Sequence, residues 1–287
     1  MTCPHCGKPN GDPANFCGWC GNALPAAADF QESQFPAAED IAPWRGGEVA
    51  LGVLIVVIAM TPVVLAAAMA AELAGRYSMP ATIWASSHFM GLVIFGVVWA
   101  FGLRRLKTNV LVGAGSNVLE KLQRTLKTGL GSLGLNRPKT NLVSSGLLAA
   151  GALGGSLGAT GVYALIVEGL DIGILVPPDI PADLAFPGAA AILTFEALAV
   201  WTPITEEIFF RGFVFGGLIP RLGVWWAMAA SALIFSLFHI DPGVLVPIFI
   251  TGFLLAGLYR LTGSLWPGIV AHAGQNAVAL LAIMFLS

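Results

Sequence analysis

Three short stretches in the C-terminal third of the chain place ionisable or amide side chains within otherwise apolar sequence. They are TEEIFFRG with Glu206, Glu207 and Arg211, FSLFH with Phe235 and His239, and HAGQN with His272 and Asn276. An ionisable side chain inside a membrane span is costly and by default indicates a functional site. Because a glutamate in an apolar setting can act as a general base, these stretches predict proton-transfer chemistry within a membrane.

Spacing within the first stretch gives its two glutamates different environments. Glu207 and Arg211 are four residues apart, so they share one helix face and can pair. Glu206 points about 100° away from Glu207 on an α-helix. We therefore expect the arginine to neutralise Glu207 and to leave Glu206 unpaired as the candidate base. A purely structural Glu207–Arg211 pair is an equally good interpretation of this spacing.

The second stretch is expected at the same depth as the first. If the spans that carry Glu206 and His239 form an antiparallel hairpin, equal depth requires a turn between Leu222 and Gly223. The sequence has PRLG there, which is typical of a turn after Pro220. Both side chains would then lie about 25 Å along their helices from the turn. The hairpin therefore predicts a shared site.

The third stretch fits that depth less well. His272 and Asn276 are four residues apart and share one helix face. Counting from a turn near Gly263 places His272 only about 14 Å along its helix. Tilt, a break at Pro242 or Pro247, or a misplaced span boundary could each close this difference.

Other polar residues in apolar sequence carry less information. His88 has no companion in the second apolar run, so we expect it to be structural. Glu196 precedes Glu206 by about three helical turns on a similar face, which weakly predicts that it lines the same cavity. The neighbouring aromatic side chains are expected to serve packing: Phe209, Phe210, Phe235 and Phe238.

Long apolar runs must position these stretches. The 287 residues are 56% hydrophobic and 10% charged, with a mean hydropathy of +0.81, whereas soluble domains have about 25% charged residues. Since about 20 apolar residues cross the hydrocarbon core of a bilayer, we expect an all-α, polytopic transmembrane helical bundle with about seven spans. The spans lie near 49–71, 81–103, 142–169, 188–218, 224–241, 244–260 and 265–286.

The distribution of charge predicts how the bundle is oriented. Eight of the 14 Lys and Arg residues fall between Arg104 and Lys139. By the positive-inside rule the basic loop 104–140 is cytosolic, and counting back two spans places the N-terminus of this multi-pass cell-membrane protein in the cytosol. The segment 170–187 then lies outside, with three aspartates and no Lys or Arg. A net charge of −2 gives no reason to expect a nucleic-acid partner.

The N-terminal 22 residues contain all four cysteines of the chain, in two C-x-x-C pairs: Cys3, Cys6, Cys17 and Cys20. Two such turns supply four sulfurs for one tetrahedral, structural zinc ion. A disulfide or redox pair is the alternative, which a cytosolic location disfavours. We therefore predict a zinc ribbon at 1–22, with a cytosolic protein as its potential partner, and a flexible linker at 23–47. The polar N-terminus has no apolar core of a signal peptide.

In their order on successive spans, the motifs E-E-x-x-x-R, F-x-x-x-H and H-x-x-x-N resemble those of a known family of intramembrane proteases. This is the CAAX prenyl protease and bacteriocin-processing family, also called the abortive infection family. The resemblance covers about residues 185–287, which would form the catalytic core, while 48–184 would supply N-terminal transmembrane helices. It implies that Arg211 with Glu207 keeps the helix and its carboxylate in place.

The resemblance also implies roles for the remaining motif residues. Glu206 would activate a water molecule, and His239 and His272 would position that water or bind a metal ion. Asn276 would help hold the oxyanion, an interaction worth roughly 3–4 kcal/mol in a dry site. A Glu–His–His set could hold a catalytic zinc with one open position, or the histidines could orient the water without a metal. We favour the metal-free glutamate mechanism.

The resulting functional prediction is an intramembrane endopeptidase, of glutamic or metallo type, that cleaves a membrane-associated peptide or protein in the lipid bilayer. Prenylated, CAAX-type substrates are implied by the name of the family and by no residue of this chain. The alternative is a catalytically silent membrane scaffold or bacteriocin-immunity-type protein that binds a partner. A transporter is disfavoured, because internal repeats are typical of that class and we find none in the sequence.

Overall fold

The computed structural model describes residues 6–8, 42, 44–73, 78–105 and 127–286. The chain divides into two compact units, Met1–Ile41 and Ala42–Ser287. Of the four cysteines only Cys6 lies among the described residues, where it is exposed. Most of the predicted zinc ribbon, of the linker 23–47 and of the basic loop 104–140 thus lies outside the described residues, and all three stay predictions.

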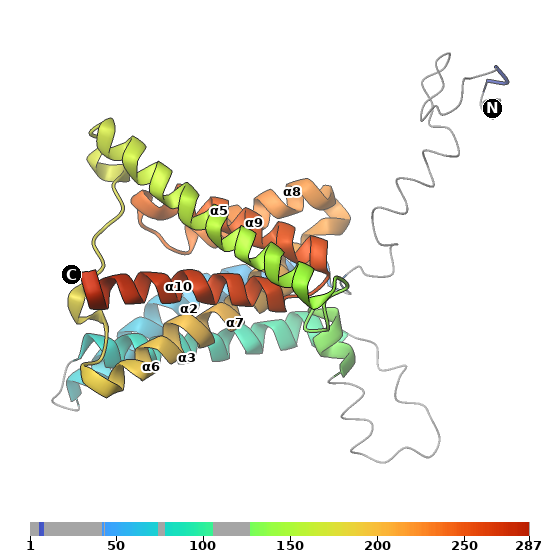
Figure 1. Ribbon diagram of the computed structural model, residues 1–287. Helices are drawn as coiled ribbons and strands as arrows, with labels where there is room; N and C mark the ends of the chain where they lie inside the picture. The colour runs from blue at the N-terminus through green and yellow to red at the C-terminus, as the bar shows by residue number, and fades with distance from the viewer. Residues whose placement is uncertain (1–5, 9–41, 43, 74–77, 106–126, 287) are drawn as a thin grey trace. The chain divides into compact units, whose positions relative to one another are not determined.

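Every regular element that the structure describes in the second unit is helical, as predicted (Figure 1). The α-helices are α2 (Gly46–Leu73), α3 (Met79–Val97), α5 (Leu142–Gly169), α6 (Ala191–Phe195), α7 (Thr202–Glu207), α8 (Gly216–Leu237), α9 (Pro242–Thr262) and α10 (Trp266–Leu286). The π-helical segments are η2 (Val98–Gly102), η8 (Glu196–Trp201) and η9 (Ile208–Phe215). The 3₁₀ turns are η3 (Leu103–Arg105), η5 (Gly173–Leu175), η6 (Ala182–Leu184) and η7 (Gly188–Ala190).

Six helical stretches among the described residues are long and apolar enough to cross a membrane, one fewer than predicted. The difference lies in Gly188–Leu237, a stretch of 50 residues that contains the predicted fourth span and most of the fifth. A straight helix of that length would measure about 75 Å, far more than the ~30 Å of a hydrocarbon core. The stretch therefore cannot cross a bilayer as one straight helix.

The stretch bends at Gly223, whose φ of 70° and ψ of 171° are not helical. Beyond this point the chain runs back beside the preceding segment, as the hydrogen bond from Ser231 Oγ to the Phe210 carbonyl at 2.8 Å shows. The ring centroids of Phe210 and Phe235, which lie equally far from the predicted turn, are 5.0 Å apart. The predicted hairpin and its turn after Pro220 are confirmed, and glycine suits the turn because it adopts positive φ without a steric cost.

The outer faces of the bundle are apolar. Along α2, Leu54, Ile58, Leu65 and Met69 are each more than half exposed. Rows of exposed large apolar side chains are rare on soluble monomers and indicate contact with lipid or protein. With six candidate spans, these faces indicate a multi-pass membrane protein.

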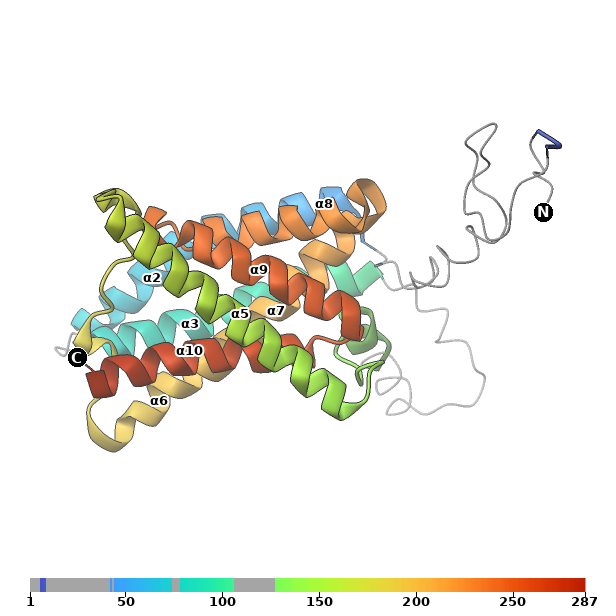
Figure 2. The same cartoon turned by 45° about the horizontal axis from the view of Figure 1, so that its top comes forward.

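The two ends of the bundle differ in charge. At one end the Lys139 N–H donates to the Thr262 carbonyl at 2.7 Å, and the start of α2 at Gly46 lies beside the Arg221 side chain. The aspartate-containing segment 170–187 lies at the opposite end (Figure 2). This separation is the one that the positive-inside prediction requires, and the cytosolic location of the basic end stays a prediction.

The core of the bundle forms around η9, in which all eight residues are buried. Trp44 is also fully buried, and its Nε1 donates to the Phe213 carbonyl at 2.7 Å. Phe209, Phe210 and Phe235 pack in the same cluster, as predicted for them. Because η9 directly follows α7, this core fixes the position of the two glutamates.

Candidate active site in the bundle

The two glutamates lie on α7, a six-residue α-helix between the π-helical segments η8 and η9. At the end of η8 the Thr202 N–H donates to the Ala197 carbonyl, five residues earlier. Pro203, in the first turn of α7, has no N–H to continue this pattern. The π pattern therefore offers no main-chain donor to the Leu198 carbonyl. Such π segments are rare and occur frequently at functional sites.

Glu207 and Arg211 form the predicted pair. Arg211 Nη1 donates to Glu207 Oε1 at 2.8 Å, and neither side chain is exposed. Arg211 Nη2 also donates to the Gly252 carbonyl of α9 at 3.2 Å. Its guanidinium carbon lies 4.4 Å from the centroid of the Phe235 ring. The arginine therefore neutralises Glu207 and joins α7, α8 and α9 at one point.

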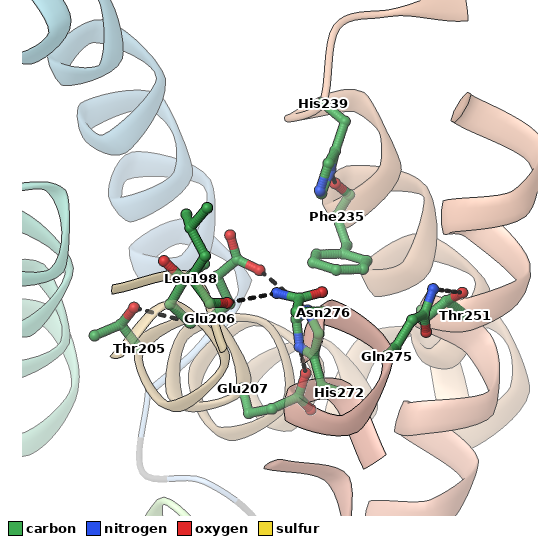
Figure 3. A network of polar contacts seen from close by, with 12 residues as sticks. Leu198, Thr205, Glu206, Glu207, Phe235, His239, Thr251, His272, Gln275 and Asn276 are labelled. Atoms are coloured by element: carbon green, nitrogen blue, oxygen red, sulfur yellow. Dashed lines mark hydrogen bonds and ion pairs between the residues drawn. The ribbon is translucent and has the colours of Figure 1, made fainter. Parts of the chain in front are cut away.

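His272 of α10 connects the two glutamates (Figure 3). Its Nδ1 is 3.0 Å from Glu207 Oε1, and its Nε2 is 3.6 Å from Glu206 Oε2. A carboxylate only accepts hydrogen bonds, so Nδ1 is the donor toward ionised Glu207. The lone pair of a neutral ring then lies on Nε2, on the side of Glu206. Glu206 keeps 22% of its side chain exposed, whereas Glu207 is fully buried.

The starting point of α10 explains why His272 reaches the glutamates despite the predicted difference in depth. A methyl group on Gly212 would lie 3.5 Å from the Leu265 side chain, so α10 begins beside Gly212. Gly212 precedes the hairpin turn by about 16 Å of helix. His272 follows Leu265 by seven residues, and Glu206 precedes Gly212 by six residues. Since Leu265 and Gly212 lie side by side, His272 and Glu206 reach a similar depth. The turn near Gly263 therefore does not lie at the level of the hairpin turn, and this offset closes the predicted difference in depth.

Asn276 lies one turn beyond His272 on α10, and its side chain contacts η8. Its Nδ2 donates to the Leu198 carbonyl at 2.7 Å, the acceptor that the π pattern and Pro203 leave without a main-chain donor. An asparagine amide has two N–H groups, and only one of them is used by Leu198. Figure 3 shows the Asn276 amide beside the Glu206 carboxylate.

His239 does not join the glutamates directly. Its Nδ1 lies 3.1 Å from the Phe235 carbonyl of its own helix, and its ring meets the Phe235 ring edge-on at 5.1 Å. Phe235 in turn contacts the His272 ring edge-on at 5.7 Å. Figure 3 shows His239 above Phe235, pointing toward the level of Glu206 and Asn276. The structure thus brings Glu206 and His272 together and leaves His239 at the edge of the site.

The predicted ligands of a catalytic metal do not form a ligand set in this arrangement. Among the described residues, no group of three or more His, Cys, Asp or Glu side chains is placed to hold a metal ion. Glu207 is held by Arg211, and His239 is separated from His272 by the Phe235 ring. We therefore derive no step through a metal.

A second polar cluster was missed by sequence reasoning. His88 was expected to stand alone, but its Nε2 lies 3.2 Å from Glu196 Oε1, and Trp84 Nε1 donates to Glu196 Oε2 at 3.0 Å. Glu196 therefore faces α3 and not the side of Glu206. One feature could have indicated this contact: His88 and Glu196 each lie about nine residues from the start of a helical stretch, and therefore at a similar distance from that end of it.

Comparison with known proteins places the motif residues within a described family domain. Residues 188–278, about a third of the chain, match a family model described as "Type II CAAX prenyl endopeptidase Rce1-like". The matched region contains α7 and the part of α10 that carries His272 and Asn276. The resemblance predicted for 185–287 is supported over this region.

One curated protein of Bacillus subtilis (strain 168), named "Putative membrane peptidase YdiL", is 35% identical to this chain over 79 residues. The aligned region is 28% of this chain and 32% of that protein, so the chain spans about a third of the relative's length. No solved structure matches the chain. The similarities support an intramembrane protease in general terms.

Proposed function

We propose that this protein is an intramembrane endopeptidase that hydrolyses a peptide bond of a membrane-associated substrate with a water activated by Glu206. The observation that carries the proposal is the arrangement around His272. Its Nδ1 faces Glu207, which Arg211 neutralises, and its Nε2 faces Glu206 at 3.6 Å. The pairing leaves one carboxylate, Glu206, available as a base in a partly buried site.

The distance between Glu206 and His272 suits a shared water molecule. A separation of 3.6 Å is too long for a direct hydrogen bond. Both groups can accept, and a water molecule has two hydrogens to donate. A water molecule that lies beside this pair and donates to both Glu206 Oε2 and His272 Nε2 would have its oxygen lone pairs directed away from both, toward a substrate carbonyl.

The hydrolysis then follows from these groups. Glu206 takes a proton from the water as the water oxygen bonds to the carbonyl carbon, and the carbonyl oxygen becomes an oxyanion. The second N–H of Asn276, beside the one that binds the Leu198 carbonyl, would donate to this oxyanion. The C–N bond breaks as the oxyanion collapses, and Glu206 returns the proton to the leaving amine. The products are a carboxylic acid and an amine.

His239 is assigned to the water or to the substrate carbonyl on the basis of its motif. Its position beyond the Phe235 ring requires the substrate or a water to lie between it and Glu206. Prenylated CAAX-type peptides are the first substrates to test, because the matching family model is described as a prenyl endopeptidase.

The test is cleavage of hydrophobic and prenylated peptides by the purified protein in lipid nanodiscs. We expect wild-type cleavage and its loss in Glu206→Ala, His239→Ala and Asn276→Ala. Gln275→Ala is the matched control for Asn276, because Gln275 bonds to Ser156 on another face of α10. Retained cleavage in both Glu206→Ala and His239→Ala would refute the assigned roles. Stable wild-type protein that cleaves no peptide would favour the scaffold alternative.

The N-terminal unit and the orientation belong to the same proposal. We propose that Cys3, Cys6, Cys17 and Cys20 hold one structural zinc and that this unit lies in the cytosol, where it contacts a protein partner. Metal analysis of the full chain and of a chain lacking residues 1–22 tests this. Zinc should be present at about one ion per full chain and absent from the shorter one. Zinc retained by the shorter chain would place the metal elsewhere.

A further inference from the structure

The second polar cluster joins α3 to both ends of the π-helical segment η8. At the first residue of η8, the two carboxylate oxygens of Glu196 are held by Trp84 Nε1 at 3.0 Å and His88 Nε2 at 3.2 Å. The other His88 nitrogen, Nδ1, lies 2.7 Å from the Trp84 carbonyl, so both ring nitrogens face an oxygen acceptor. The imidazole is therefore fixed in direction by α3 and η8 together.

The last residue of η8 is held by the same part of α3. Trp201 Nε1 donates to the Ser87 carbonyl at 3.1 Å, and its ring stacks on His88 at 5.0 Å with an interplanar angle of 12°. Trp84 lies against His88 as well, with ring centroids 4.2 Å apart. We call Trp84, His88, Glu196 and Trp201 the α3 brace.

Between the two braced ends, the Leu198 carbonyl of η8 contacts the active site through Asn276. The Leu198 carbonyl has no donor in the π pattern because the residue five positions later is Pro203. It accepts the Asn276 Nδ2 hydrogen bond at 2.7 Å. The direction of this carbonyl therefore fixes the plane of the Asn276 amide and, with it, the direction of the second N–H.

We propose that Glu196 and His88 are positioning residues that act through the Leu198 carbonyl to aim the free N–H of Asn276 at the substrate oxyanion. This inference rests on the proposed function and extends it to residues outside the three motifs. Neither residue bonds to Glu206, Glu207 or His272, so their effect on catalysis must pass through η8. Because the oxyanion forms only during the reaction, their loss should lower kcat and leave KM nearly unchanged.

A double-mutant cycle in peptide cleavage tests this path. We expect Glu196→Ala to lower kcat about tenfold with KM within about twofold, less than the ~10²-fold that a 1 Å misplacement can cost. Glu196→Gln keeps an oxygen that can accept from Trp84 and should recover most of the rate. In an Asn276→Ala background, Glu196→Ala should change kcat by less than about twofold, because the group it positions is already absent.

Trp44→Phe is the matched control for the cycle. It removes an indole hydrogen bond from a buried place elsewhere in the bundle, the one that Trp44 Nε1 donates to the Phe213 carbonyl at 2.7 Å. Its effect on kcat should be the same factor with and without Asn276. If Glu196→Ala also lowers kcat by one factor in both backgrounds, the brace is only structural and the inference is wrong.

A readout that needs no activity separates this inference from the proposed function. In protein labelled with ¹⁵N-asparagine, the side-chain amide signal of Asn276 is assigned by its loss in Asn276→Asp. We expect Glu196→Ala to shift this signal and Trp44→Phe to leave it in place. If the wild-type protein cleaves no peptide and Glu196→Ala still shifts the Asn276 signal, the proposed function is refuted and the brace is retained. An unmoved signal would refute the brace, whatever the activity.

Discussion

Removal of Arg211 is the most severe test of the electrostatics that we derive for the site. Arg211→Met replaces the fully buried arginine with an apolar side chain of similar shape, so the charge is removed while most of the volume is retained. It leaves the Glu207 carboxylate, also fully buried, with His272 as its remaining partner. Glu207 Oε2 already has no hydrogen-bond partner within the described part of the chain, so this second oxygen offers no contact that would replace the arginine.

The magnitude follows from the contacts that disappear. Breaking a buried ion pair by removal of one partner costs about 3–5 kcal/mol, because the other charge stays buried and uncompensated. The substitution also removes the hydrogen bond from the Arg211 guanidinium to the Gly252 carbonyl, worth about 1.5–3 kcal/mol for a charged donor, and the contact of the guanidinium with the Phe235 ring. Removal of both charges, in Arg211→Met with Glu207→Leu, should cost less than Arg211→Met alone, because no unpaired charge remains.

The assay is unfolding by denaturant in mixed micelles, followed by tryptophan fluorescence, for the wild type, both single variants and the double variant. We expect Arg211→Met to lose at least about 3 kcal/mol and the double variant to regain part of that loss. Gln275→Leu, which removes a half-buried polar side chain that bonds to Ser156, is the uncharged control. A double variant less stable than Arg211→Met would show that Glu207 and Arg211 do not form an ion pair in the folded protein.

Three further substitutions test the fold that positions the site, each by the same unfolding assay. Gly91→Ala should destabilise by about 1–3 kcal/mol through overpacking, because its Cβ would lie 2.5 Å from Trp201 Nε1; Gly96→Ala, where nothing lies within 4 Å, is the matched control and should not. Gly223→Ala should cost about 1–2 kcal/mol, since φ of +70° is unfavourable for any residue with a Cβ; no loss would mean that the hairpin turns elsewhere. Ser231→Ala should cost about 1 kcal/mol through the lost bond to the Phe210 carbonyl, and an unchanged stability would contradict the close approach of the two hairpin arms.

Local spacing predicted those parts of the site that depend on one helix or one turn. Glu207 and Arg211 pair because residues four apart meet on an α-helix, whatever surrounds them. The hairpin turn was predicted because Gly223 follows Pro220 at the point where two polar groups had to reach equal depth. Both inferences need only the geometry of one chain segment, which the sequence determines directly.

Contacts between distant helices could not be predicted in the same way. The depth of His272 depends on where α10 begins relative to Gly212, and no residue of α10 encodes that level by itself. His88 and Glu196 are 108 residues apart, and one chain without relatives gives no means of pairing them. The position of His239 beyond the Phe235 ring is likewise set by packing of α8, which its motif spacing does not describe.

The π-helical segments explain one further departure from expectation. Regular α-helical counting puts Glu196 and Glu206 about 80° apart around the helix axis, near enough for the predicted shared cavity, yet Glu196 bonds to α3 and Glu206 lies beside α10. Residues Glu196–Trp201 are π-helical, and hydrogen bonds that span five residues widen the turn and shift every later side chain around the helix axis. The same shift leaves the Leu198 carbonyl without a main-chain donor before Pro203 and gives Asn276 its acceptor. One local departure from the α-helix thus directs Glu196 and Glu206 toward different helices. It also exposes the Leu198 carbonyl that holds the Asn276 amide beside Glu206.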